Sequence, residues 1–208
     1  MKAVKVDAGS DELASPGSSK WDAVEAGEVS LSPTPPEYKT NEYVRAAWAD
    51  KAHGVVNSVA VKAAHNGDTL AVRLEWDDTE HPESEFPDAC AVAFPANGSA
   101  DLGTLGSDDS PVNLWFWRAD RGNEGEDVLA KGVKNLATLS REDVKASAEF
   151  NSGRWSVVLS RALSGGDGAQ LSAGSSQPVA FLIWEGKNEE RAGLAAYSGS
   201  WTDLEIEG

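Results

Sequence analysis

One run of eight residues, PVNLWFWR at positions 111–118, most constrains how this chain can fold. A β-strand places successive side chains on opposite faces, so the run divides into two faces. One face carries Val112, Leu114 and Phe116, and the other carries Asn113, Trp115 and Trp117. Neither face has the charged side chains of a strand with one side in water. The run therefore predicts a central strand that is covered on both faces.

The two faces favour different surroundings. The face with Val112, Leu114 and Phe116 suits the interior between two packed sheets. The face with Trp115 and Trp117 allows two interpretations, because indoles fill cores and also line binding surfaces. In the first, the domain itself covers both indoles. In the second, the indoles form the floor of a pocket or an interface.

Strand-like alternation and turn residues recur along the chain and predict an all-β fold. Asn66-Gly67 and Asn151-Ser152-Gly153 each lie between two alternating apolar runs, as hairpin turns do. We count about eight to ten strands and little helix, although residues 126–139 could form one or two helical turns. The prediction is an antiparallel β-sandwich with minor helix. We expect one domain over residues 21–208, after a flexible leader rich in Ser, Gly and Asp at residues 1–20.

The charge of the chain excludes two classes of partner. The formal net charge is −16, from 34 acidic and 18 basic residues that are scattered along the sequence. Such a chain repels nucleic acid and anionic lipid. Dispersed acidity is also typical of proteins that stay soluble in very high salt, so we expect a halophilic protein with an acidic surface. An ordinary acidic protein is the alternative.

Targeting signals are not apparent. No apolar run reaches the roughly 18–20 residues of a membrane span, and residues 1–7 lack the apolar segment of an export signal. We expect either a cytoplasmic protein or one exported with a signal-bearing partner. The single cysteine, Cys90, lies in an apolar run and is interpreted as a buried thiol.

Residue patterns for catalysis are sparse. The three histidines, His53, His65 and His81, show no metal-ligand spacing. Asp77 and Asp78 follow an apolar strand and could bind a cation or cap a turn, and we favour the turn because no third acidic ligand lies at a recognisable spacing. The sequence therefore predicts that the chain is not an enzyme by itself.

Several segments, in order, resemble the signatures of one family. They are residues 74–78 (LEWDD), 86–95 (FPDACAVAFP), 111–119 (PVNLWFWRA), 153–163 (GRWSVVLSRAL) and 178–186 (PVAFLIWEG), followed by Trp201. They look like those of the haem b (gamma) subunits of type II dimethyl-sulfoxide-reductase-family enzymes, such as ethylbenzene dehydrogenase and the selenate and chlorate reductases. The resemblance spans about residues 21–206 and implies a β-sandwich similar to family-nine carbohydrate-binding modules.

The resemblance also implies a cofactor. Members of that family bind one haem b through a methionine and a lysine, and exchange electrons with an iron–sulfur subunit that serves a molybdenum subunit. The positions that match the two ligands read Leu105 and Ala195 here, and Met1 is the only methionine. No haem ligand is therefore expected on this chain, and Leu105, Trp115, Trp117 and Ala195 are predicted to mark a degenerate haem pocket. Replacement ligands such as His53 or His81 remain an alternative.

Two functions of different class follow. The first is a non-catalytic accessory subunit of a molybdenum oxidoreductase, nitrate-reductase-like, that docks on the iron–sulfur subunit. A haem b electron carrier with replacement ligands is a variant of it. The resemblance implies the extracytoplasmic face of a membrane-associated complex for this role, with the cytoplasm as the alternative. The second function is a carbohydrate-binding module in which Trp115, Trp117 and Trp184 stack on sugar rings.

Overall fold

The computed structural model describes residues 1–78 and 85–208, and within them the chain is almost entirely β-structure. The strands are β1 (Lys2–Lys5), β2 (Gly27–Ser30), β3 (Ser32–Pro33), β4 (Ser58–His65), β5 (Thr69–Asp77), β6 (Ala89–Pro95), β7 (Val112–Arg118), β8 (Gly125–Ala130), β9 (Leu136–Ser140), β10 (Lys145–Asn151), β11 (Arg154–Ala162), β12 (Ser176–Trp184), β13 (Ala196–Tyr197) and β14 (Thr202–Ile206). Two short α-helices, α1 (Ser10–Ala14) and α2 (Glu42–Ala47), accompany them. The 3₁₀ turns are η1 (Ser19–Ala23), η2 (Pro36–Tyr38), η3 (Leu102–Thr104), η4 (Ala119–Arg121) and η5 (Gly186–Asn188).

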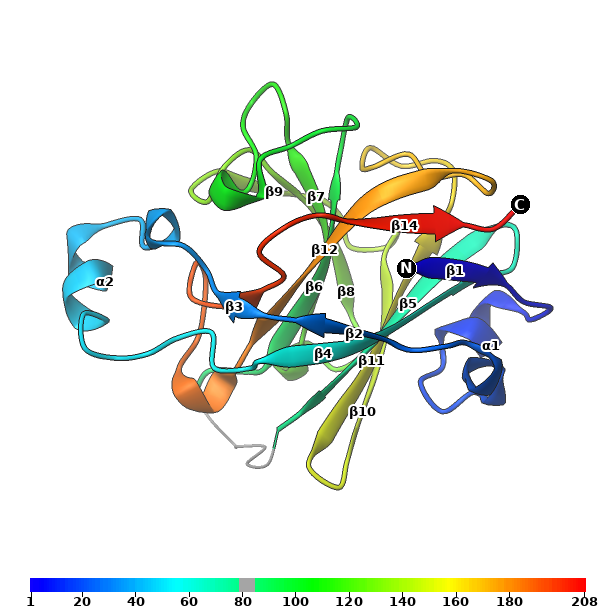
Figure 1. Ribbon diagram of the computed structural model, residues 1–208, viewed down its shortest axis with the longest axis horizontal. Helices are drawn as coiled ribbons and strands as arrows, with labels where there is room; N and C mark the ends of the chain where they lie inside the picture. Colours follow the sequence, from blue (N-terminus) through cyan, green and yellow to red (C-terminus); the bar gives the residue numbers. More distant parts are fainter. Residues whose placement is uncertain (79–84) are drawn as a thin grey trace.

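The strands form two packed layers that share one strand (Figure 1). Hydrogen bonding follows the order β10-β11-β5-β4-β1-β14-β12-β6-β7-β8-β9. The first half of β12 pairs with β14 and its second half with β6, so β12 passes from one layer to the other. The predicted β-sandwich is confirmed. The described residues form fourteen strands, more than we counted, because β1, β8 and β9 were not predicted as strands and β3 and β13 have only two residues each.

Two local predictions were wrong. Residues 1–20 are not a flexible leader, because β1 inserts between β4 and β14 and pairs with both in parallel. Ala3 and Leu13 are fully buried, so the segment adds to the core. Residues 126–139 form no helical turn. They contribute β8 and β9, which pair as a hairpin, and β8 is buried on both faces.

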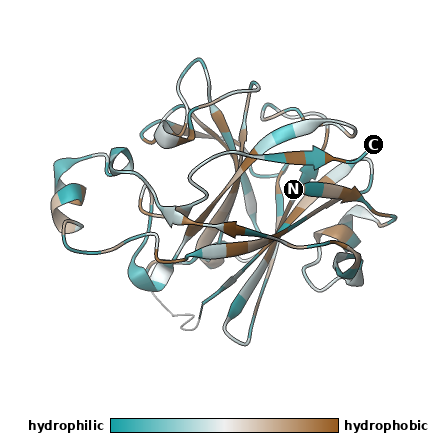
Figure 2. Ribbon diagram, viewed as in Figure 1, coloured by the Kyte–Doolittle hydropathy of each residue, from teal (hydrophilic) through white to brown (hydrophobic). Residues whose placement is uncertain are grey.

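The main hydrophobic core fills the space between the two layers. Its largest members on one layer are Phe94, Trp115, Trp117 and Phe181, and the facing layer supplies Trp76 and Trp155. Trp117 meets Trp155 across the sandwich with ring centroids 5.0 Å apart. Figure 2 shows hydrophobic residues along the strands that cross the middle of the molecule and hydrophilic residues at the hairpin ends. Two smaller cores lie on the outer faces of the layers.

The orientation of β7 is the reverse of the prediction. Trp115 and Trp117 point into the sandwich and are 0% and 1% exposed. Leu114 and Phe116 point outward and pack in the second core, on the outer face of the layer. Trp117 packs against Trp155 of the facing layer and Trp115 packs against Phe94, so the two indoles fill the interior and the smaller side chains remain for the outer face.

Candidate functional site

An apolar cavity of about 600 Å³ lies over the outer face of the layer that contains β7. Its floor comes from four neighbouring strands, through Ala89 on β6, Leu114 and Phe116 on β7, Val128 on β8, and Leu182 and Trp184 on β12. The rings of Phe116 and Trp184 meet edge to face at 5.5 Å. The floor is therefore apolar and partly aromatic.

Loops close the cavity from the sides. Leu105 follows η3 with a backbone φ of 56°, and Ala192 follows η5 with a φ of 52°. Left-handed backbone costs a residue with a side chain about 1–2 kcal/mol relative to right-handed backbone. Gly193 packs so tightly that an added Cβ would lie 2.2 Å from the Tyr38 carbonyl oxygen, so only glycine fits there. The walls are held in costly conformations, which is typical of ligand-binding loops.

Charged side chains surround the mouth of the cavity. Arg118, Arg121 and Arg191 all line it. Arg121 donates to Glu126 at 2.5 Å, and Arg118 pairs with Asp120 at 2.7 Å. Burial favours the neutral form of Glu126, but hydrogen bonds from Thr138 and Arg121 outweigh it and hold the pKa of Glu126 below its usual value. The lining thus carries arginine side chains together with the carboxylates of Glu85, Glu126 and Glu190.

The predicted pocket residues separate into two groups. Leu105 lines the cavity, and Ala195 lies in the same outer core without reaching the lining. Trp115 and Trp117 lie on the other side of the sheet, where the protein interior covers them. The interpretation of these two indoles as a pocket floor was therefore wrong, and Phe116 and Trp184 take that place.

The donor atoms around the cavity do not suit a haem iron held by two strong ligands. Among the described residues, its lining contains no methionine, histidine, cysteine or lysine. Tyr38 lines it, but its hydroxyl donates to the Leu102 carbonyl at 2.6 Å, and burial raises its pKa. Such a phenol resists the ionisation that iron ligation by tyrosine needs.

The remaining ligand candidates lie elsewhere. His53 shares a hydrogen bond with the Thr34 carbonyl at 3.1 Å and does not line the cavity. Cys90 is buried in the inner core, as predicted, and burial raises the pKa of its thiol. His81 lies outside the described residues.

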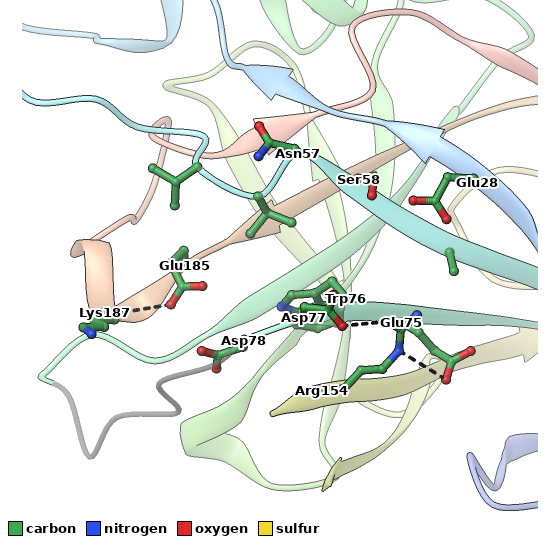
Figure 3. Close-up of a pocket in the computed structure, with 13 residues that line it drawn as sticks. Glu28, Asn57, Ser58, Glu75, Trp76, Asp77, Asp78, Arg154, Glu185 and Lys187 are labelled. Atoms are coloured by element: carbon green, nitrogen blue, oxygen red, sulfur yellow. Dashed lines mark hydrogen bonds and ion pairs between the residues drawn. The ribbon is translucent and has the colours of Figure 1, made fainter. Parts of the chain in front are cut away.

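A second, polar hollow of about 440 Å³ lies where β5 and β12 end (Figure 3). Asp78 and Glu185 line this hollow, Asp88 lies buried beside them, and one oxygen from each of the three lies within 4.8 Å of the others. Asp88 accepts a hydrogen bond from the Gly186 amide at 2.8 Å and another from the Trp155 indole at 3.1 Å. Three convergent carboxylates are a ligand set suited to a hard cation.

The proximity of these carboxylates changes the proton affinity of Glu185. Burial raises the pKa of Glu185 to about 7, and the negative charges of Asp78 and Asp88 add to the shift. The sequence search missed Asp88 and Glu185 as neighbours of Asp78. A signal was available in the sequence, since acidic residues flank the ends of three apolar strands. In the structure Trp184 pairs with Ala89, and this pairing brings the adjoining Glu185 and Asp88 together.

Comparison with known proteins gives one family. A sequence profile described as ethylbenzene dehydrogenase matches residues 18–135 and 125–196. A Haloferax mediterranei protein assigned as the heme subunit of a respiratory nitrate reductase is 30% identical over 196 residues, which cover 90% of this chain and 67% of that protein. The gamma subunit of chlorate reductase from Ideonella dechloratans is 35% identical, over 70% of this chain and 64% of that protein.

The chain is also similar to another relative in sequence and to two solved structures in fold. The gamma subunit of dimethylsulfide dehydrogenase from Rhodovulum sulfidophilum is 32% identical, over 69% of this chain and 58% of that protein. The chain thus spans only part of these relatives, between 58% and 67% of their length. A family-nine carbohydrate-binding module from Caldicellulosiruptor kristjanssonii in complex with glucose has a TM-score of 0.56 at 11% identity and covers 100% of this chain and 95% of its own. A Bacteroides uniformis carbohydrate-binding protein has a TM-score of 0.59 at 11% identity, with coverages of 100% and 98%. These structures share the fold.

Proposed function

We propose, since the chain belongs to the ethylbenzene dehydrogenase family of haem (gamma) subunits, that it is a non-catalytic accessory subunit of a molybdenum oxidoreductase. The family predicted from the sequence motifs is confirmed. The observation that carries the proposal is the match over 90% of the chain to a relative assigned as a nitrate reductase heme subunit. We therefore propose that the chain is a subunit of a nitrate-reductase-like complex.

The proposed role is assembly and docking rather than electron relay through a haem iron with two axial ligands. The lining of the apolar cavity supports this, because among the described residues it holds none of the side chains that give a haem b its strong axial bonds. In this proposal the chain docks on the iron–sulfur subunit, and the molybdenum cofactor and iron–sulfur clusters reside on the partners. No helix in the described part of the chain is long and apolar enough to cross a membrane.

The proposal has two further attributes, the location of the complex and the salt requirement of the chain. The extracytoplasmic face of a membrane-associated complex follows from the family alone, with the cytoplasm as the alternative. A halophilic protein follows from the net charge of −16. Circular dichroism across a salt series tests the second attribute, which requires a folded chain in molar salt and an unfolded one in dilute buffer.

The carbohydrate-binding alternative loses two of its three residues. Trp115 and Trp117 are 0% and 1% exposed in the inner core and cannot stack on a sugar. Trp184 borders the apolar cavity but is only 8% exposed, so its ring offers little surface on which a sugar could stack. The likeness to carbohydrate-binding modules therefore supports the fold and not that activity.

The experiment is a pull-down of the tagged chain from its native cells in molar salt. Mass spectrometry identifies retained proteins, and elemental analysis measures molybdenum and iron. We expect an iron–sulfur subunit and a molybdenum subunit to be retained together with this chain. A chain recovered alone, with neither metal above the level of a tag-only control, would refute the accessory-subunit role.

A further inference from the structure

The strand order ends in two edge strands, β10 at one end and β9 at the other, and the protein treats them differently. The outer side of β10 is closed along part of its length. Glu124 forms an antiparallel β-bridge with Lys145 there. The Ala148 amide donates a hydrogen bond to the side-chain oxygen of Asn123 at 3.1 Å. β10 therefore has neighbours on both sides.

β9 has a neighbour on one side only. It pairs with β8, and in the described part of the chain no backbone group outside β8 is hydrogen-bonded to residues 136–140. The amides and carbonyls on its other side therefore point outward. We call this side of residues 136–140 the open edge. An open edge can accept a further strand from another chain.

The sequence of β9 lacks the features that usually protect an edge. Protected edges carry charged side chains or proline, or are very short. β9 reads LATLS and has five residues with neither charge nor proline, whereas β10 carries Lys145 and Glu149. The register of β9 against β8 shifts only after Thr138, so residues 136–138 pair regularly. The open edge is thus a regular strand with nothing to oppose pairing.

An exposed apolar side chain stands on the open edge. Leu136 is 51% exposed, and the other exposed large hydrophobic side chains among the described residues are Tyr43 and Val55. Leu136 and Thr138 lie at the β9 border of the apolar cavity. A strand added to β9 would lie about 4.8 Å away, so its side chains would pack against Leu136. Strand addition would therefore cover this apolar surface.

The charge near the start of β9 differs from that of the whole chain. Residues 128–141 contain three basic residues and no acidic one, although the net charge of the chain is −16. Lys131 and Lys134 precede the strand and are exposed. Lys131 lies 3.8 Å from the exposed Asp108, and Glu37 lines a small hollow with both lysines. Lys134 forms no ion pair with a described residue, so its ammonium can pair with a partner's carboxylate.

The other end of β9 is mixed in charge. Arg141 follows the strand and pairs with Glu126 at 3.2 Å, and Glu142 and Asp143 come next. A partner segment with carboxylates at one end therefore fits best when that end lies beside Lys131 and Lys134. A second copy of this chain fits poorly, because it would bring the same lysines and a further net charge of −16.

We propose that β9 docks an extended segment of the iron–sulfur subunit by strand addition, with carboxylates of that segment beside Lys131 and Lys134. Backbone hydrogen bonds along the open edge hold the segment, and its apolar side chains cover Leu136. This surface is a docking site only if the proposed function holds, since that function supplies the partner.

Hydrogen–deuterium exchange tests the strand addition directly. The natively purified complex is compared with the isolated chain, both in molar salt. We expect exchange of the outward amides of residues 136–140 to slow by about tenfold or more in the complex, because the added strand bonds to them. Residues 145–151 of β10 are the internal reference and are expected to exchange alike in both samples. Equal exchange of residues 136–140 in both samples would overturn the inference.

Proline substitutions remove single amides from β9. Successive amides of a strand point to opposite sides, so only one of Leu136→Pro and Ala137→Pro removes an outward amide. That variant is expected to keep the melting temperature of the wild type, because the pairing with β8 is intact. We expect it to retain less than about a tenth of the wild-type amount of iron–sulfur subunit in the pull-down.

A charged edge provides a second variant in case both proline variants unfold. Leu136→Lys places a charge on the open edge at an exposed position and is expected to reduce retention of the iron–sulfur subunit to a similar extent. Val55→Lys makes the same change at another exposed aliphatic side chain and is the matched control. It is expected to retain the partner as the wild type does.

The carboxylates of the partner segment are tested with a carbodiimide, which joins a lysine amine to a carboxylate in contact with it. In the native complex we expect cross-links from Lys131 or Lys134 to aspartate or glutamate of the iron–sulfur subunit. Lys145, on the closed edge, is expected to give none to that subunit. The reverse pattern would contradict docking at β9.

The possible failures are distinguishable. If folded edge variants retain the iron–sulfur subunit, the docking surface is wrong and the accessory-subunit role stands. If the isolated chain self-associates and the edge variants abolish this, the open edge binds a second copy and the inference is overturned. If the wild-type chain is recovered without partner subunits, the accessory-subunit role and the docking surface are both refuted.

Discussion

The two faces of β7 carry side chains of similar polarity and serve opposite purposes. The inner face buries Trp115 and Trp117 against aromatic rings from both layers, and Asn113 joins a buried polar network. The outer face carries Leu114 and Phe116 and opens onto a cavity of about 600 Å³. The largest side chains are thus used to fill the interior, and smaller ones leave space outside. In this fold the space for a ligand lies on the outer face of a sheet, where loops cover it.

The two faces also differ in how they treat charge. On the inner side Arg161 and Asp127 are 3% and 0% exposed and lie 3.2 Å apart, and Asn113 bridges them. On the outer side the arginines stand at the mouth of the cavity and remain partly exposed. Both sides hold paired charges, but the inner pair is sealed in the core, whereas the outer pairs of Arg118 with Asp120 and of Arg121 with Glu126 reach the surface. The predictions below test this contrast.

The largest expected difference in unfolding free energy is between substitutions of two adjacent residues that lie on opposite faces of β7. Trp115→Ala empties the fully packed inner core and is expected to lower the free energy of unfolding by about 3–5 kcal/mol. Phe116→Ala removes a ring that already borders a cavity, so we expect a loss of about 1 kcal/mol. Denaturant unfolding at fixed molar salt measures both values. Equal losses would mean that the outer face is packed as tightly as the inner one.

A similar test uses neighbours on β8. Asp127 points inward to Arg161, and Val128 points outward to the cavity. Asp127→Ala leaves the guanidinium buried without its carboxylate and is expected to lower the free energy of unfolding by about 3 kcal/mol or more. Val128→Ala is expected to cost about 1 kcal/mol. Thermal or denaturant unfolding compares the two.

The double variant Arg161→Met with Asp127→Leu provides the control for that test. It replaces the buried pair by apolar side chains and is expected to be more stable than Asp127→Ala alone. If the double variant is the less stable one, the network contributes through specific hydrogen bonds rather than through mutual charge compensation.

A third prediction contrasts the buried carboxyl group of Asp127 with the half-buried one of Glu185. Asp127 faces a cation, whereas Glu185 faces Asp78, Asp88 and Glu190, with Lys187 beside it. The pKa of Glu185 is raised from 4.5 to about 7, so the folded state keeps a proton that the unfolded state releases between these values. The free energy of unfolding therefore falls as the pH rises from about 4.5 to 7.

Glu185→Gln removes that cost. We expect the variant to match the wild type below about pH 4.5 and to be the more stable of the two above about pH 7. Melting temperatures between pH 4 and 8 provide the measurement. Glu142→Gln, which removes one exposed carboxylate, is the matched control. Parallel curves for the Glu185→Gln variant and the wild type would show that Glu185 titrates normally.

The smallest effect concerns the strained wall of the cavity. Ala192→Gly relieves the positive φ of 52° at an exposed position. Relief of left-handed strain outweighs the greater freedom of glycine in the unfolded chain, so we expect a gain of about 0.5–1 kcal/mol. A matched Ala→Gly change at Ala137, in the exposed strand β9, is expected to lose stability. A loss at both positions would show that Ala192 is not strained.

The sequence predicted the strands well and their orientation poorly. The alternation in PVNLWFWR identified β7, and the Asn-Gly pair at position 66 identified the β4–β5 hairpin. Alternation does not tell which of two apolar faces points inward, because the choice depends on the volume opposite, here Trp155 on β11. β1 was missed because four residues are too few for a clear pattern, and it is held by strands far along the chain.

The sites show the same limit. Leu105 was found through a family motif, and the structure places it on the cavity wall. Asp78, Asp88 and Glu185 are brought together only by the pairing of β12 with β6 and by the position of β5, which no local pattern encodes. Arg191 and Phe86 form one stacked pair from segments that are distant in sequence. Such neighbours follow from the topology of the sheets.

The visible spectrum of the chain mixed with haem, before and after dithionite, tests the central claim most directly. We proposed that the chain serves in assembly and docking rather than in electron relay, because the described lining of the apolar cavity has no methionine, histidine, cysteine or lysine to hold a haem iron. This account predicts a broad Soret band and no sharpened α band on reduction, in the natively purified complex as well as in the isolated chain. A sharp α band assigned to this chain would contradict the account, because it requires two strong axial ligands on the iron.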